Sequence, residues 1–257
     1  MVTKYSEKIK IYNHYTNYKG RLFIKTLCDL FNDVAERQTE MLGVDVDTLN
    51  KEGLTWMLHR LHIRLYKMPH KEEKVILETW PSGVDRLFAL RDYQMIREDG
   101  EVIVKAVSEW MTIDLKRRRP VRLSPRVVDM STEHSIEKLD LGHLLYEKEV
   151  KTEGMKFARR FTATFDNIDF NGHVTQASYM RWITNSLPFE FLRNHILEEV
   201  EVVYEHEILP DSPVLAWYEM RTSPEGNLVI HHLLRDENNE RTHCVACTVW
   251  QEHTDNR

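Results

Sequence analysis

Apolar positions along the chain fall into two similar halves, each with a helical segment that precedes several strands. Residues 22–41 and 179–191 carry apolar side chains at the three- and four-residue spacing of a helix with one buried face. In the first half, runs rich in β-branched and aromatic residues follow the helical segment and predict strands. The predicted strands are residues 61–66, 75–80, 90–96 and 102–113, with a hairpin turn at Glu98-Asp99-Gly100.

Strand motifs of the first half recur in the second half in the same order, at an offset of roughly 140 residues. The paired segments are 61–66 with 200–204, 75–80 with 214–217, and 106–110 with 244–250. Such matches indicate a duplicated unit, and a helix followed by antiparallel strands predicts α+β architecture with a sheet wrapped around the helix. We expect a domain over residues 1–130, a linker over 131–155 and a second domain over 156–257. Joining the two sheets edge to edge would cover an exposed edge strand in each.

Composition and charge restrict the classes of function. The 257 residues carry a net charge of −6, which argues against a nucleic-acid-binding surface because such binding relies on Lys and Arg against phosphates. Three cysteines are too few for a disulfide scaffold, and Cys244 and Cys247 are interpreted as buried structural thiols. Residues 1–10 lack the apolar core of a signal peptide, and no apolar run approaches the roughly 18 residues of a membrane span. We therefore expect a cytoplasmic protein that does not contact membranes.

The most informative polar cluster is Asp169-Phe170-Asn171-Gly172-His173, between a strand-like segment and the second helix. Backbone N–H groups at a helix start favour negative charge, so they could stabilise the oxyanion that forms when a carbonyl is attacked. A plainer interpretation is that Asp169 and Asn171 shape a turn and cap the helix. The corresponding turn of the first half, Asn17-Tyr18-Lys19-Gly20-Arg21, has neither the histidine nor the acid, which favours a functional role in the second half.

A second carboxylate, Glu207, follows the strand that comes after this helix. Aligned on the repeat, Glu207 lies opposite Met68 of the first half, so one copy has a charge where the other has an apolar side chain. This asymmetry again favours function. The alternative is an ordinary surface glutamate at the end of a strand.

These residues resemble the acyl-acyl-carrier-protein thioesterases, and the resemblance extends over nearly the whole chain. The family's Asp-x-Asn-x-His-Val signature matches Asp169 to Val174, and its following tyrosine matches Tyr179. Its Tyr-Lys-x-Pro and Glu-Thr-Trp motifs match Tyr66 to Pro69 and Glu78 to Trp80. The resemblance implies two tandem hot-dog domains that hydrolyse fatty acyl thioesters carried on acyl carrier protein (ACP) in fatty acid biosynthesis.

The chemistry implied by the resemblance is general-base hydrolysis without a metal or redox cofactor. Asp169, Asn171 and His173 match the signature triplet, and Glu207 matches the family's downstream glutamate. Plant members have a cysteine directly after that glutamate, where this chain has Ile208, and this difference favours attack by water. Glu207 would take a proton from water while His173 and Asn171 fix water and thioester, with Asp169 orienting Asn171 or the loop. Whether Glu207 or His173 is the base stays open.

The resemblance also places an apolar slot for the acyl chain, mainly in the first domain. The candidate lining residues are Leu54, Trp56, Met57, Met68 and Phe88, although residues of these types more often belong to an ordinary core. An acidic carrier protein would prefer a positive surface, and a basic run supplies one, although a solvated turn explains the same run. This run consists of Lys116, Arg117, Arg118 and Arg119.

Two other functions fit the same residues. An acyl-CoA thioesterase could use the same site, because only the thiol carrier differs. A non-catalytic hot-dog protein would bind the acyl thioester without turnover, since a fold does not dictate a function. The preferred acyl chain and the oligomeric state, a homodimer included, stay open.

Overall fold

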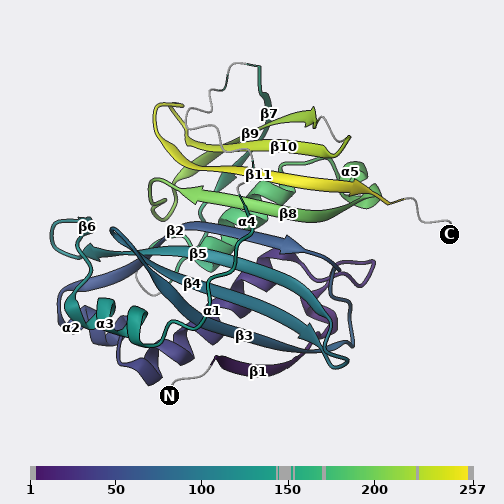
Figure 1. Cartoon of the computed structure of the whole chain (residues 1–257). Helices are drawn as coiled ribbons and strands as arrows, with labels where there is room; N and C mark the ends of the chain where they lie inside the picture. Colours follow the sequence, from purple (N-terminus) through teal and green to yellow (C-terminus); the bar gives the residue numbers. More distant parts are fainter. Residues whose placement is uncertain are drawn as a thin grey trace. The chain divides into compact units, whose positions relative to one another are not determined.

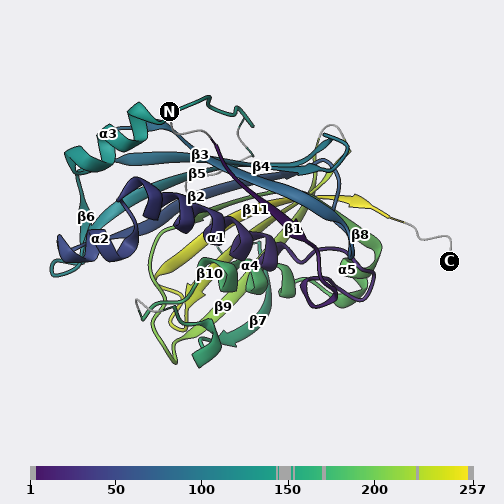
Figure 2. The same cartoon turned by 90° about the horizontal axis from the view of Figure 1, so that it is seen from below.

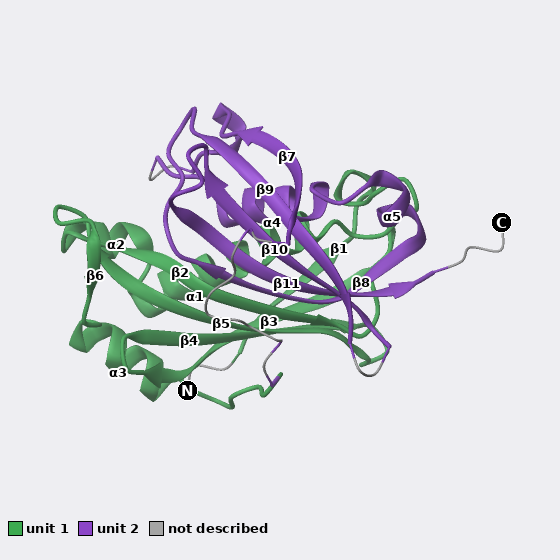
Figure 3. Cartoon of the chain, turned by 90° about the horizontal axis from the view of Figure 1, so that it is seen from above, with its two compact units in different colours: residues 1–141 green, residues 142–257 purple. Residues whose placement is uncertain are grey.

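The computed structural model describes residues 4–142, 144, 152, 154–169, 172–223 and 226–253. The chain divides into two compact units, unit 1 over residues 1–141 and unit 2 over residues 142–257 (Figure 3). In both units a helix lies against one face of an antiparallel sheet (Figure 1). The predicted α+β architecture of two hot-dog units is therefore confirmed.

Unit 1 forms its sheet in the strand order β1-β3-β4-β5-β2, with the short β6 paired to β5. Its elements are β1 (Tyr5–Lys10), η1 (Asn13–Tyr15), α1 (Ile24–Leu42), α2 (Val46–Lys51), β2 (Leu54–Leu65), β3 (Lys74–Asp85), β4 (Phe88–Arg97), β5 (Val102–Asp114), β6 (Arg119–Val121) and α3 (Pro125–Glu133). Figure 2 shows the long helix α1 running across one face of this sheet. The Phe31 ring of α1 stacks on Tyr93 of β4 at 4.6 Å between ring centroids, which fixes the buried side of the helix.

Unit 2 forms its sheet in the strand order β8-β11-β10-β9-β7. Its elements are β7 (Lys156–Thr162), η2 (Phe165–Asn167), α4 (Gln176–Asn185), α5 (Phe189–Asn194), β8 (His195–Tyr204), β9 (Pro213–Thr222), β10 (Leu228–Asp236) and β11 (Thr242–Glu252). The ring of Trp182 in α4 stacks on Phe161 of β7, so this shorter helix takes the place in unit 2 that α1 takes in unit 1.

A pair of tryptophans records the duplication in the packing. In β5 the Trp110 indole N–H donates to the Ser108 hydroxyl at 2.8 Å, and in β11 the Trp250 indole donates to the Thr248 hydroxyl at 2.7 Å. Each hydroxyl lies two residues before its tryptophan, on the same face of the strand. The two contacts occupy the segments that the sequence repeat pairs, which confirms the repeat at the level of single hydrogen bonds.

Some predicted elements differ in their bounds. The predicted helix over 179–191 is two helices, α4 and α5, because Pro188 has no N–H to continue the first and instead precedes the second. The hairpin at Gly100 is confirmed, and that glycine has a φ of 90°. Helix α3 was not predicted, although Ser124 caps it and Pro125 occupies its first turn. The predicted domain bounds and the edge-to-edge joining of the sheets stay predictions.

The first part of the predicted linker crosses the face of the unit 1 sheet that lies opposite to α1. The Trp80 indole donates to the Glu137 carbonyl at 2.7 Å, and the Leu139 amide donates to a carboxylate oxygen of Asp92 at 2.6 Å. The Ser82 hydroxyl donates to the other oxygen of Asp92 at 2.8 Å. The Asp92 side chain is therefore a buried anchor for this segment. None of the helices described is long and apolar enough to cross a membrane.

The Asp92 anchor predicts a pH-dependent stability. Burial raises the pKa of Asp92 from 3.8 to about 6, so the folded protein holds a proton between these values that the unfolded chain releases. Folding is consequently favoured below pH 4, and this contribution is lost as the pH rises through about 6, by about 2–3 kcal/mol at most. Urea titrations would measure the unfolding free energy of wild type and of Asp92→Asn. The difference, wild type minus variant, should fall by about 2–3 kcal/mol between pH 4 and pH 7.

The exposed Asp129→Asn variant is the control and should show no such pH dependence. A wild-type-minus-Asp92→Asn difference that stays constant from pH 4 to 7 would contradict the role given to Asp92.

Candidate active site

The loop that carries His173 is closed by its own backbone and by one carboxylate. The Asp169 amide donates to the His173 carbonyl at 2.8 Å, and the His173 amide donates back to a carboxylate oxygen of Asp169 at 3.1 Å. The Gly172 amide donates to the Asp169 carbonyl at 3.0 Å, with Gly172 at a φ of 80°, a conformation that favours glycine. Asp169 thus closes the loop through both its main chain and its side chain, and its role in catalysis stays a prediction.

A second loop leaves β8 and carries Glu207. The amides of Glu205 and His206 both donate to the carbonyl of His243 in β11, at 2.9 and 3.2 Å, so the loop begins at a fixed point. The Val174 amide donates to the Ile208 carbonyl at 3.2 Å and joins this loop to the His173 loop. Because the joined residues directly follow His173 and Glu207, the two side chains emerge next to each other.

The imidazole of His173 and the carboxylate of Glu207 meet at 2.9 Å between Nε2 and Oε2. Their side chains are 29% and 43% exposed, so water reaches the pair. A carboxylate beside an imidazole can accept and return a proton, which is the equipment of general acid–base catalysis. The structure therefore brings together three of the four predicted catalytic residues, and the fourth, Asn171, lies outside the described residues.

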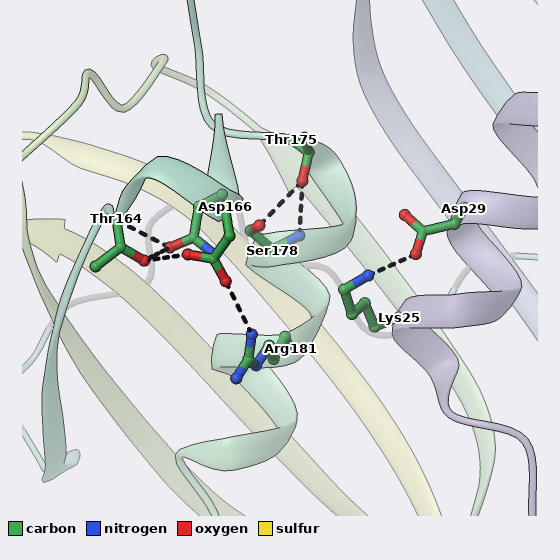
Figure 4. Close-up of polar contacts among 8 residues, drawn as sticks. Lys25, Asp29, Thr164, Asp166, Thr175, Ser178 and Arg181 are labelled. Carbon is green, nitrogen blue, oxygen red and sulfur yellow. Dashed lines mark hydrogen bonds and ion pairs between the residues drawn. The ribbon is translucent and has the colours of Figure 1, made fainter. Parts of the chain in front are cut away.

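Helix α4 starts directly after this loop. Its N-cap is Thr175, whose hydroxyl accepts from the Ser178 amide at 3.3 Å (Figure 4). The helix cap is therefore Thr175 and not Asp169, which corrects that part of the plainer interpretation. On the preceding turn, Thr164 donates to Asp166 at 2.5 Å, and Asp166 lies 3.9 Å from Arg181 of α4 (Figure 4). These contacts fix the entry of the chain into the loop.

Unit 1 contains the same loop with different side chains. The Asn17 amide donates to the Arg21 carbonyl at 2.8 Å, and the Arg21 amide donates to the Asn17 side-chain oxygen at 3.1 Å. The Gly20 amide donates to the Asn17 carbonyl at 2.8 Å, with Gly20 at a φ of 75°. Asn17 thus occupies the position of Asp169, and Arg21 occupies the position of His173. Closing the turn requires an Asp or Asn and the glycine, but it does not require a histidine.

The second loop has its counterpart in unit 1 as well. The Leu22 amide donates to the Pro69 carbonyl at 2.8 Å, which repeats the bond that joins the two loops of unit 2. Met68, which precedes Pro69, therefore occupies the position of Glu207, as the sequence alignment predicted. The fold is the same without the acid, so Glu207 and His173 are not retained to close these loops.

Cysteine chemistry has no place among the described residues of the site. Ile208, at the position where the plant sequences have a cysteine, is fully buried. The three cysteines of the chain are free and buried, as predicted for Cys244 and Cys247. Burial raises the pKa of Cys247 to about 12 and also raises the pKa of Cys28 and of Cys244, so none of them is a thiolate at neutral pH.

The five candidate acyl-binding residues lie in different surroundings within unit 1. Leu54 and Trp56 pack against a core cluster between β2, β4 and the helices α2 and α3. Met57 and Phe88 point to the opposite face of the sheet by strand alternation, and Phe88 stacks on His59 at 4.9 Å. Met68 is half-buried in the loop after β2. Leu54 and Trp56 thus share one apolar region, and the role of all five in binding an acyl chain stays a prediction.

The basic run covers the exposed turn between β5 and β6 and the first residue of β6. Lys116, Arg117, Arg118 and Arg119 are all exposed. The Arg117 amide donates to Asp114 at 2.7 Å, which holds the turn, and Arg118 adopts a φ of 51°. These residues present positive charge to solvent. Their proposed contact with a carrier protein stays a prediction.

Sequence reasoning missed one residue next to the site. His243 is buried at the start of β11 and its imidazole lies 3.4 Å from the His206 carbonyl. No motif marks it, because it comes 36 residues after Glu207 and reaches the loop through strand pairing.

Comparison with protein families matches residues 2–131 to the acyl-ACP thioesterase N-terminal domain and residues 147–252 to the acyl-ACP thioesterase C-terminal domain. The chloroplastic oleoyl-acyl carrier protein thioesterase 2 of Arabidopsis thaliana is 26% identical over 251 residues, which cover 89% of this chain and 65% of the relative. The chain spans a little under two thirds of the length of such relatives. The predicted cytoplasmic location and the homodimer stay predictions.

Solved structures show the same fold over almost the whole chain. An acyl-ACP thioesterase from Bacteroides thetaiotaomicron superposes with a TM-score of 0.82 at 24% identity, covering 96% of this chain and 97% of that one. A 12:0-ACP thioesterase from Umbellularia californica superposes with a TM-score of 0.86 at 17% identity, covering 97% and 94%. At these identities the likeness establishes the shared fold.

The cap of α4 gives a test of how the loop is held. Thr175→Ala removes the acceptor for the Ser178 amide and should lower the unfolding free energy by about 1 kcal/mol in urea denaturation. Thr175→Ser keeps the hydroxyl, so its unfolding free energy should fall by only a small part of this amount. Equal losses in the two variants would show that the threonine methyl group, and not the cap, stabilises this segment.

Proposed function

Because the chain belongs to the acyl-ACP thioesterase family, we propose that it hydrolyses fatty acyl-ACP thioesters to a free fatty acid and holo-ACP. The observation that carries the proposal is the His173–Glu207 pair at 2.9 Å, open to water. The pair lies on two loops of unit 2, and the corresponding loops of unit 1 have Arg21 and Met68 at these positions. A duplicated fold with one acid–base pair fits an enzyme with one catalytic unit and one unit free for another task.

In the proposed reaction a water molecule attacks the thioester carbonyl carbon. The Glu207–His173 pair removes a proton from this water as the new C–O bond forms, and the charge gathers on the carbonyl oxygen. Backbone N–H groups at the start of α4 favour that charge. The intermediate then collapses, the C–S bond breaks, and the departing thiolate of the carrier takes the proton to become a thiol.

Either member of the pair can be the initial base. At 2.9 Å the carboxylate and the imidazole are close enough to pass a proton directly from one to the other. We assign the proton removal to Glu207, with His173 and Asn171 fixing the water and the thioester.

We place the carrier protein on unit 1, where the charge is more favourable. Unit 1 has 24 Lys and Arg against 22 Asp and Glu, whereas unit 2 has 11 against 19. An acidic carrier is attracted to the positive unit and repelled by the negative one. The exposed turn of Lys116 to Arg119 concentrates that charge, and the acyl chain would enter the apolar region of the same unit.

The activity is tested by thiol release from a series of acyl-ACPs of different chain length. Wild type should turn over, and His173→Ala and Glu207→Gln should each lower kcat at least about 100-fold, the scale of a lost acid–base group. Arg21→Ala, at the position of His173 in unit 1, is the matched control and should stay within about threefold of wild type.

Two other outcomes are informative. Binding of acyl-ACP without thiol release would overturn the enzyme and leave an acyl-thioester-binding protein. Faster turnover of acyl-CoA than of acyl-ACP at equal chain length would keep the chemistry and change the carrier.

The docking turn is tested by reversing its charge. The double variant Arg117→Glu, Arg119→Glu should raise the KM for acyl-ACP about tenfold and leave the KM for acyl-CoA nearly unchanged. The wild-type KM for acyl-ACP should rise with salt, and the variant's should rise less. Arg193→Glu on α5 of unit 2 serves as the control. A KM that rises equally for both substrates would show that the turn supports the fold and does not bind the carrier.

A further inference from the structure

The peptide that precedes Glu207 is contacted by a buried phenol. The Tyr179 hydroxyl donates to the carbonyl of His206, the residue before Glu207, at 3.4 Å. Tyr179 therefore contacts the peptide group that directly precedes the acid.

A second buried side chain reaches the same carbonyl. The Nδ1 atom of His243 lies 3.4 Å from the His206 oxygen, and its own backbone carbonyl accepts from the amides of Glu205 and His206. His243 is thus in contact with this loop through both its main chain and its side chain. Two side chains from different elements, α4 and β11, converge on one peptide oxygen.

Unit 1 has no acid at the position of Glu207, and it shows which residues occupy the positions of Tyr179 and His243 in that case. Leu27 lies four residues after the N-cap of α1, as Tyr179 lies four residues after the N-cap of α4, and Leu27 is buried. The carbonyl of Ile103 accepts hydrogen bonds from the amides of Tyr66 and Lys67. The carbonyl of His243 accepts from the corresponding two amides of unit 2, and Ile103 is buried as His243 is. The counterparts of the phenol and the imidazole are therefore a leucine and an isoleucine.

The comparison separates folding from positioning. The loop of unit 1 makes the same backbone hydrogen bonds with two apolar side chains, so the loop does not need a hydroxyl or an imidazole to form. Burying a phenol and an imidazole costs free energy that a leucine and an isoleucine do not. The two polar groups stand in the copy that has Glu207, and both contact the carbonyl of the residue before it.

We infer that Tyr179 and His243 are positioning residues that hold the Glu207 carboxylate against His173 by fixing the His206 peptide. The inference rests on the proposed function, because it assigns these residues to the same site. Neither side chain needs to touch the substrate. Their effect reaches the reaction through the orientation of the acid.

The protonation of both groups suits this role. Burial raises the pKa of Tyr179, so the phenol keeps the hydrogen that it donates. Burial likewise lowers the pKa of His243, so its imidazole is neutral at pH 7 and has one N–H to offer from Nδ1. Neither contact adds charge beside the His173–Glu207 pair. Both contacts are long for hydrogen bonds, so the expected effects are moderate.

The first experiment is a double-mutant cycle in acyl-ACP hydrolysis. Tyr179→Phe removes only the hydroxyl and should lower kcat about tenfold with KM within about twofold. In the Glu207→Gln background the same change should lower kcat less than about twofold, because the group it positions is already gone. Tyr218→Phe is the matched control, since Tyr218 is 6% exposed and Tyr179 is 4% exposed in the same unit.

The second variant pair tests the imidazole. His243→Asn keeps a donor near the Nδ1 position and should retain most of kcat. His243→Ile introduces the unit 1 residue and should lower kcat about fivefold without loss of thermal stability, because unit 1 folds with isoleucine there.

Hydrogen–deuterium exchange measures the positioning without any turnover. The segment 204–210 should exchange faster in Tyr179→Phe and in His243→Ile than in wild type, and unchanged in Tyr218→Phe. Failure of wild type to hydrolyse acyl-ACP would refute the proposed function and leave this measurement valid.

An equal loss of kcat from Tyr179→Phe in both backgrounds would overturn the inference. The inference would also be overturned if residues 204–210 exchanged in both single variants at the same rate as in wild type. The peptide would then be held by other contacts.

Discussion

The hydrogen bond from the Val174 amide to the Ile208 carbonyl sets the geometry of the site. His173 and Glu207 are 34 residues apart in the sequence, and each directly precedes one partner of this bond. Once the two loops are joined there, the backbone brings the imidazole and the carboxylate within reach of each other. The bond in turn depends on the burial of α4 and on the pairing of β8 with β11, which set the ends of both loops. Side chains held in this way are already oriented before a substrate arrives.

Because main-chain bonds close these loops, most of their side chains are free to differ. The Asn17 and Asp169 side chains make the same contact to an amide four residues on, and a glycine with positive φ follows in each loop. At the remaining positions the two units diverge, with Arg21 in place of His173. The chemistry is thus added to a loop that is complete without it, and it can be examined separately from folding.

Much of the fold could be predicted from the sequence, because the apolar periodicity and the repeat are properties of the chain itself. The position of Glu207 opposite Met68 was also predictable, since both follow a recognisable strand motif. The contact of His243 with the His206 carbonyl was not, because the register of β11 against β8 creates it and no motif records that register. The anchoring of residue 139 by Asp92 escaped prediction for a similar reason, since an irregular segment makes the contact. The break at Pro188 was visible in the sequence, but the apolar spacing on both sides of it favoured one helix.

Unit 1 retains the turn with Asn17 and Gly20 while it has Arg21 and Met68 where the other copy has its acid–base pair. In evolutionary terms, a gene that duplicates such a fold gains a copy released from selection for catalysis but still under selection for folding. Mutations that abolish chemistry in that copy are neutral as long as the main-chain bonds persist. The interior of the released copy can then change to suit a different function. Such changes would be selected against if both units of the chain had to keep an active site.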